Sequence, residues 1–237
     1  MRRICTICAR GGSQGVKNKN IREIAGKPLL AHSIDQAVRS DMFLAVAVSS
    51  DSPEICETAR QWGATHVIDR PSDLASHTAP KIPAIRHCTT GVEALTGKPF
   101  DIVVDLDATA PLRNIDDIKG AIAELENGVW NNVVTGTPAR RSPYFNMVEA
   151  MPDGRVVLSK PPETPIPRRQ DAPECFDLNA SVFCWRRSAL NEKGDFVLTE
   201  NTGLFVMPEH RSIDIDTELD FRIVTHLMTR GDLLLDA

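Results

Sequence analysis

Two groups of charged residues in this sequence have the types and spacing that phosphate and metal chemistry need. The first is residues 10–20 (RGGSQGVKNKN), where Arg10, Lys17 and Lys19 surround three glycines. Glycines let backbone N–H groups approach phosphate oxygens, and three cations offset a charge of about three or four. The stretch is neither a Walker P-loop nor a G-x-G-x-x-G dinucleotide motif. It therefore predicts a triphosphate site of another kind, with a solvated basic loop as the alternative.

The second group is the pair Asp214 and Asp216 in the stretch S-I-D-I-D-T (212–217). A short strand would aim both carboxylates to the same side, and Mg²⁺ prefers one or two carboxylates together with phosphate oxygens. We therefore expect these two residues to bind Mg²⁺. Asp216 also precedes Thr217, so the alternative is that it only caps the last helix.

Composition excludes several classes of protein. The chain has 237 residues, of which 42% are hydrophobic and 25% charged, and its net charge of -5 argues against nucleic acid as a partner. No apolar segment is long enough to span a membrane, and the first apolar run is too short for a signal peptide.

Cys5 and Cys8 form a C-x-x-C, but on a strand their side chains would face opposite ways. We predict a cytoplasmic protein with reduced cysteines rather than a redox or zinc pair.

The elements that must position these groups alternate between apolar strands and amphipathic helices, which predicts an α/β fold with a parallel or mixed sheet and helices on both faces. The last helix is expected to turn its apolar side chains inward, and Asn114 is expected to cap an earlier helix. Predicted strands cover residues 4–9, 43–49, 65–68, 102–106, 132–137 and 180–186; predicted helices cover 28–40, 52–62, 81–95, 115–126 and 217–228, with Leu219, Ile223, Val224, Leu227 and Met228 buried on the last.

Residues 138–176 interrupt this alternation. They hold many of the 16 prolines, a possible hairpin at Pro152-Asp153-Gly154, and the basic run PRRQ. We interpret the chain as one domain, residues 1–237, that carries residues 138–176 as an inserted arm. The arm is either a lid over the site or a contact with another subunit.

Several motifs resemble, in order, those of the acylneuraminate cytidylyltransferases (CMP-sialic acid synthetases). The opening motif is A-R-G-G-S-Q-G-V-K-N-K-N-I followed by G-K-P-L-L-A-H-S-I, and the resemblance extends over roughly residues 4–228. The later motifs are V-S-S-D-S, D-R-P-S-D-L-A-S-H-T-A (69–79), L-D-A-T-A-P-L-R (106–113), P-R-R-Q-D-A-P, L-N-A-S-V-F and S-I-D-I-D-T-E-L-D (212–220). This resemblance implies a Rossmann-like nucleotidyltransferase fold of three layers. It also implies the reaction of CTP with a 2-keto-3-deoxy sugar acid to give a CMP-sugar and pyrophosphate.

The resemblance assigns roles to individual residues. Arg10 and Lys19 would hold the triphosphate, and Asp214 and Asp216 would bind the metal in catalysis. Gln14 stands where many members have lysine, and Lys17 is a candidate replacement. The nucleotide site would consist of Arg10, Gly11, Gly12, Ser13, Lys19, Asn20, Arg70, Thr78 and Ala79. Arg70 has the alternative role of a plain surface residue.

The sugar site departs from the family pattern at two positions. Asp107 replaces a glutamine that contacts the sugar, and with Asp105 it forms a second D-x-D, so it belongs either to an altered sugar pocket or to an extra metal site. Asp177 stands where relatives carry an arginine that meets the sugar carboxylate. Asn179 matches a family asparagine, and Arg168 is expected to reach from the arm into the site of a partner in a homodimer.

We therefore predict a Mg²⁺-dependent cytidylyltransferase for a nonulosonic acid, a sialic-acid-like sugar. The alternatives are an enzyme that uses a 3-deoxy-octulosonate, one that uses another base, and a nucleotide-binding protein without activity.

Overall fold

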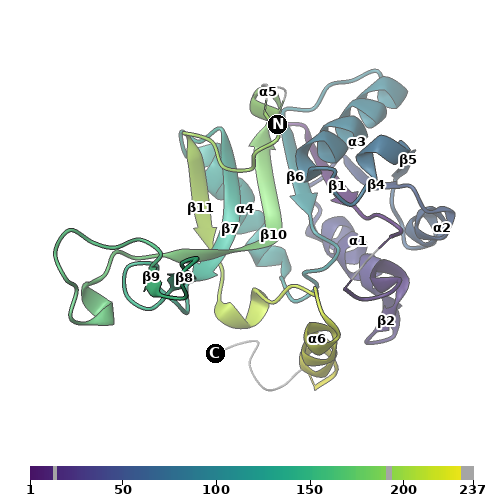
Figure 1. Cartoon of the computed structure of the whole chain (residues 1–237). Coiled ribbons are helices and arrows are strands. Elements are labelled where there is room, and N and C mark those ends of the chain that lie inside the picture. The colour runs from purple at the N-terminus through teal and green to yellow at the C-terminus, as the bar shows by residue number, and fades with distance from the viewer. Residues whose placement is uncertain (13–14, 191–193, 231–237) are drawn as a thin grey trace.

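A seven-stranded mixed sheet forms the centre of the computed structural model, which describes residues 1–12, 15–190 and 194–230 (Figure 1). The predicted roles of Ser13 and Gln14 therefore fall outside the described residues. The strand order is β11-β7-β10-β6-β1-β4-β5, and only β10 runs antiparallel to its neighbours. The strands are β1 (Arg3–Cys8), β4 (Ala45–Ser50), β5 (His66–Asp69), β6 (Ile102–Leu106), β7 (Asn132–Pro138), β10 (Phe176–Arg186) and β11 (Thr202–Val206).

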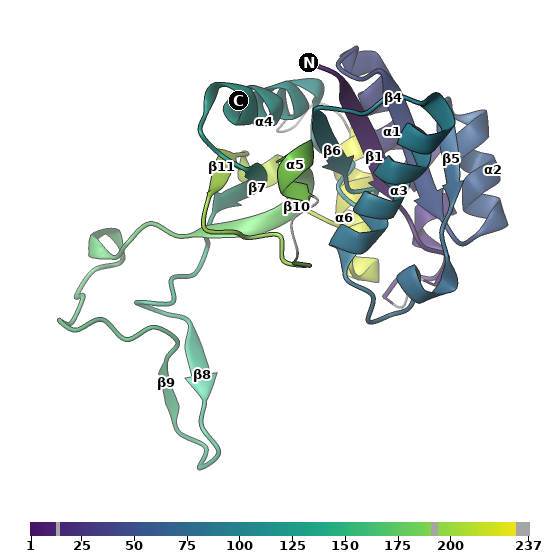
Figure 2. The same cartoon turned by 90° about the horizontal axis from the view of Figure 1, so that it is seen from above.

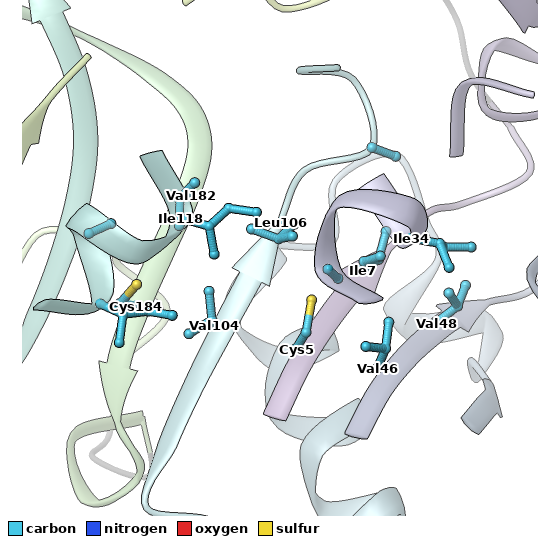
Figure 3. Packing of buried hydrophobic residues seen from close by; sticks show 14 of the residues in the cluster. Cys5, Ile7, Ile34, Val46, Val48, Val104, Leu106, Ile118, Val182 and Cys184 are labelled. Carbon is cyan, nitrogen blue, oxygen red and sulfur yellow. The ribbon is translucent and has the colours of Figure 1, made fainter. Parts of the chain in front are cut away.

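Helices cover both faces of the sheet, as the alternation predicted. One face packs against α1 (Leu29–Ser40), α2 (Pro53–Gln61) and α4 (Ile115–Asn127), and the other against α3 (Lys81–Thr96) and the short α5 (Arg187–Leu190). Figure 3 shows the first layer, where Cys5 and Val104 lie with Ile34 and Ile118. Cys8 packs into the opposite layer, and the cysteines are free. The strand interpretation of the C-x-x-C is therefore confirmed.

Most predicted elements are confirmed to within a few residues because local signals mark their ends. Asn114 caps α4 through a reciprocal capping box: its side chain accepts from the Asp117 N–H, and Asp117 accepts from the Asn114 N–H. The edge strand β11 has no counterpart in the prediction. It is a five-residue strand whose pairing partner, β7, is distant in the sequence, so no local pattern marks it.

The arm between β7 and β10 extends away from the body of the molecule (Figure 2). Its hairpin, β8 (Val148–Ala150) and β9 (Val156–Leu158), confirms the turn that we expected at Pro152-Asp153-Gly154. Among the described residues, none of the helices has the length and apolar character needed to cross a membrane.

The carboxyl ends of the parallel strands meet a third, smaller core, formed by α6 (Glu218–Arg230) and the hairpin β2 (Glu23–Ile24)–β3 (Lys27–Pro28). This core joins Val16 of the opening loop to Ile215 and Phe221. It thereby holds together the two sequence segments with the strongest chemical signals.

The predicted inner face of α6 needs a correction. Leu219 is 65% exposed and Ile223 is 40% exposed, whereas Phe221 and Val224 are buried. Leu227 and Met228 are partly buried against the third core, as expected. The reason is that α6 packs against the small third core rather than against the sheet. A narrow stripe of apolar side chains that starts at Phe221 is then enough to cover this core. The Arg22 guanidinium lies 3.8 Å from the centre of the Phe221 ring.

Candidate active site

The opening loop follows β1 and is held by contacts with two other loops. The Arg10 guanidinium donates to the Ser76 carbonyl at 2.9 Å, and the Gly11 N–H donates to Asp51 Oδ1 at 3.0 Å. A Cβ built on Gly12 would lie 3.6 Å from His77 Cε1. The structure therefore brings residues 10–12 next to the 76–79 loop, which contains Thr78 and Ala79, at the edge where ligands bind in open α/β sheets.

Asn20 and Arg70 are both buried, and the side chains of both make hydrogen bonds to neighbouring residues of the protein. Asn20 Nδ2 donates to the Arg10 carbonyl at 3.1 Å, which closes the loop on itself. The Arg70 guanidinium donates to the Ser49 carbonyl at 2.7 Å and to Ser49 Oγ at 3.2 Å. The alternative of Arg70 as a plain surface residue is therefore wrong, because only 9% of the residue is exposed.

The Asp214–Asp216 pair lies opposite this loop and contacts it through Lys19. Lys19 Nζ donates to the Ile215 carbonyl at 2.5 Å and lies 3.3 Å from Asp216 Oδ1. The segment is not the short strand that we expected. It is a loop without helix or strand structure, and the Ile215 N–H anchors it by donating to the Thr109 carbonyl at 2.9 Å.

The alternative that Asp216 caps the last helix is also wrong. Thr217 Oγ1 accepts from the Asp220 N–H at 3.2 Å, and Asp220 Oδ2 accepts from the Thr217 N–H at 2.7 Å. These reciprocal bonds supply the cap of α6. The Asp216 side chain, 74% exposed, takes no part in it.

The chemistry of this pair fits a divalent cation. Burial, and after it the adjacent Asp216 carboxylate, raise the pKa of Asp214 above its ordinary value. Neighbouring carboxylates are the donors that Mg²⁺ prefers, together with phosphate oxygens. In the described part of the chain no third acidic, histidine or cysteine side chain completes a cluster. The remaining ligands would come from a triphosphate and water.

A lysine that the sequence did not identify holds the second D-x-D. Lys81, the first residue of α3, lies 2.8 Å from both Asp105 Oδ2 and Asp107 Oδ2. Burial by itself would lower the pKa of Lys81, but the two carboxylates outweigh it and raise the pKa above its ordinary value. For Asp107 the directions are reversed. Burial by itself would raise the pKa of this acid, but the charge and hydrogen bonds of Lys81 and Thr109 outweigh burial and hold the pKa well below its usual range. The only sequence signal was that Lys81 lies two residues after Ala79 of the Thr78-Ala79 loop.

Arg113, the last residue of the L-D-A-T-A-P-L-R motif, fixes the backbone beside this cluster. It is 2% exposed, and Nη1 donates to the Asp107 carbonyl at 2.8 Å and to the Ser181 carbonyl at 3.0 Å. Burial lowers the pKa of Arg113 to about 10, so the residue keeps its charge at neutral pH. Arg113 therefore positions Asp107 through the main chain.

A cavity of about 630 Å³ opens next to Asp214, and its lining includes Asp177 and Asn179. The Asn179 amide is occupied: Oδ1 accepts from Thr135 Oγ1 at 2.6 Å, and Nδ2 donates to Ser212 Oγ at 2.9 Å. Asn179 thus ties β10 to the segment before Asp214, and a direct contact with sugar stays a prediction. Arg168 does not line this cavity; within the chain it pairs with Asp171 at 2.8 Å.

Comparison with known proteins identifies the family. Residues 4–193 match the model of a family described as Cytidylyltransferase. The chain belongs to this family. Cytidylyltransferases are nucleotidyltransferases, so it is an enzyme of that class.

Relatives of this cytidylyltransferase align over nearly their full length. It is 45% identical to CMP-N,N'-diacetyllegionaminic acid synthase of Campylobacter jejuni over 97% of this chain and 96% of the relative. It is 44% identical, with the same coverage, to post-translational flagellin modification protein B of Campylobacter coli. A Campylobacter jejuni pseudaminic acid cytidylyltransferase is 31% identical, with 93% of each chain covered.

Among solved structures, CMP:2-keto-3-deoxy-manno-octonic acid synthetase in complex with CTP has a TM-score of 0.71 at 16% identity, covering 98% of this chain and 100% of that one. This likeness confirms the nucleotidyltransferase type of fold.

Proposed function

We propose that this cytidylyltransferase transfers CMP from CTP to the anomeric hydroxyl of a nonulosonic acid and releases pyrophosphate. The observation that carries the proposal is that Lys19 of the glycine-rich loop contacts Asp216, and that Asp214 lines a cavity of about 630 Å³. A triphosphate, a divalent cation and a sugar acid would therefore meet at one place. Relatives named as synthases of CMP-legionaminic and CMP-pseudaminic acids support this substrate class. The product would be the activated sugar for glycan synthesis, and a CTP-dependent reaction fits a cytoplasmic location.

The chemistry is an in-line attack of the sugar hydroxyl on the α-phosphorus, which depends on positioning and charge neutralisation. Arg10, Lys19 and the Gly11 and Gly12 backbone would orient the triphosphate. Asp214 and Asp216 would hold a Mg²⁺ ion, which would offset charge that grows as pyrophosphate leaves. Asp107, held ionised by Lys81, can only accept hydrogen bonds, so it would meet a hydroxyl or amide N–H of the sugar.

Two alternatives have less support. A 3-deoxy-octulosonate substrate is suggested only by a solved structure that is 16% identical to this chain, and a likeness at that level supports the fold alone. A nucleotide-binding protein without activity is disfavoured because the cationic loop and the acidic pair are both present and in contact.

We expect pyrophosphate release to require CTP and Mg²⁺ together with a nonulosonic acid. The assay should compare CTP, UTP, GTP and ATP, each with legionaminic, pseudaminic, N-acetylneuraminic and 3-deoxy-octulosonic acids. Equal rates with CTP and UTP or GTP would contradict the cytidylyltransferase assignment. Turnover only with the octulosonic acid would contradict the proposed sugar class but leave the reaction in place.

We also propose that the 138–176 arm builds a homodimer. Cross-strand pairing places Val148, Ala150, Val156 and Leu158 on one face of the β8–β9 hairpin, where Val148 is 53% and Val156 is 64% exposed. A two-stranded hairpin is marginally stable alone, so its apolar face needs a partner. Arg168 and Arg169 would then reach the site of the second subunit.

Wild type is expected to sediment as a dimer, and the double variant Val148→Asp, Val156→Asp as a monomer with little activity. The matched control is Glu149→Gln, Val157→Asp, which changes the other face of the same hairpin and should stay dimeric. A monomeric variant with full activity would show that the arm is not needed in trans.

A further inference from the structure

The two D-x-D pairs each have a lysine, but the pairs differ in the exposure of their acids and in the distance from acid to lysine. Lys19 is 3.3 Å from Asp216, whose side chain is 74% exposed, so water competes for this ion pair. Lys81 is 2.8 Å from both Asp105 and Asp107. The first pair is therefore open to a metal ion, whereas the second already has its cation.

Several contacts fix Lys81 in place. Its ammonium lies 4.9 Å from the centre of the Phe183 ring, and the facing Asp105 is completely buried. Asp105 Oδ1 accepts from Thr6 Oγ1 at 2.8 Å, while Asp107 Oδ1 accepts from the Thr109 N–H at 3.0 Å. The other oxygen of Asp107 accepts a hydrogen bond from the Lys81 ammonium, whereas the buried Asp105 Oδ2 has no hydrogen-bond partner in the described part of the chain and is compensated by the charge of Lys81 at 2.8 Å.

Physical chemistry explains why a cation is needed there. Two carboxylates side by side, one of them fully buried, are costly unless positive charge compensates them. In other proteins two such carboxylates at the end of a strand are the ligands expected for a divalent ion. An ammonium 2.8 Å from an oxygen of each acid occupies the space between them, where a metal would have to bind.

We propose that the Lys81 ammonium is a built-in cation that takes the place of a second divalent metal ion at the Asp105–Asp107 pair. Lys81 is then a positioning residue, because it fixes Asp107 as an ionised acceptor toward the sugar. The enzyme would work with one metal ion, at Asp214 and Asp216. The acceptor role of Asp107 toward a sugar and the single metal ion both rest on the proposed function; the role of Lys81 at its own acid pair does not.

Mn²⁺ binding, followed by electron paramagnetic resonance of the free ion in the absence of nucleotide, tests the proposal directly. The background Asp214→Asn, Asp216→Asn is used to remove the other acidic pair. In it, Mn²⁺ should bind weakly or not at all. Adding Lys81→Met, which keeps the length of the side chain, should create one site per chain with at least tenfold higher affinity. Adding Asp105→Asn to that triple variant should remove the site again.

A folded triple variant, verified by circular dichroism, that gains no Mn²⁺ site would overturn the proposal. Should the triple variant fail to fold, the single variant Lys81→Met decides the question: without nucleotide it should bind one Mn²⁺ more per chain than wild type, and no gain would contradict the role of Lys81. Neither readout measures turnover, so failure of the proposed reaction would appear separately, in the pyrophosphate assay.

Discussion

Asp216→Asn is expected to lower turnover by roughly 10²–10³-fold while the melting temperature stays nearly unchanged. The carboxylate has no role in capping α6, because Thr217 and Asp220 supply that cap. The substitution therefore removes a charge at the proposed Mg²⁺ site without removing a structural bond of the helix. Steady-state kinetics at several Mg²⁺ concentrations and a thermal melt are the measurements, and raising Mg²⁺ should recover only part of the rate. Asp214→Asn should lower turnover to a similar extent.

Thr217→Ala, at the next residue, is the matched control, because it is expected to lower the stability of the protein rather than its turnover. It removes the capping hydroxyl and should cost about 1 kcal/mol of unfolding free energy, while both metal carboxylates remain. If Asp216→Asn instead lowered the melting temperature and kept its activity, the capping role would be restored and the metal assignment lost.

Gly15→Ala is expected to produce the second large effect. A Cβ at this position would lie 2.0 Å from the Asp216 carbonyl oxygen, which no real contact allows. The opening loop or the metal segment must then move by about 1 Å, and a misplacement of that size costs on the order of 10²-fold in rate. CTP affinity and kcat/KM should both fall, because the loop and the acidic pair separate.

Asn18→Gly serves as the control for Gly15→Ala. Asn18 is an exposed residue of the same loop with a φ of 53° and no side-chain cap bond, so glycine adopts its conformation without added volume. Its activity should stay within a few-fold of wild type. Near-normal kinetics in Gly15→Ala would show that the close approach of the two segments is not needed for function.

The charged groups of the site differ in how far the sequence predicted them. Arg10, Lys19, Asp214 and Asp216 were identified because phosphate and metal chemistry requires these residue types at short spacing, and the structure brings Lys19 to Asp216 across 197 residues. Lys81 was not identified, because its partner Asp107 is 26 residues away and no short-range pattern links a lysine at the start of one helix to a carboxylate at the end of a strand.

The sequence by itself determined the α/β alternation, most element boundaries and the opening-loop and D-x-D motifs, because buried strands, helix caps and catalytic spacings are local properties of the chain. Only the tertiary structure decided the rest. It placed β11 at the sheet edge, turned Leu219 and Ile223 of α6 outward, and brought the ammonium group of Lys81 to the second acidic pair. Each of these depends on which distant segment packs alongside, and packing between segments far apart in sequence leaves no periodic signal in either of them.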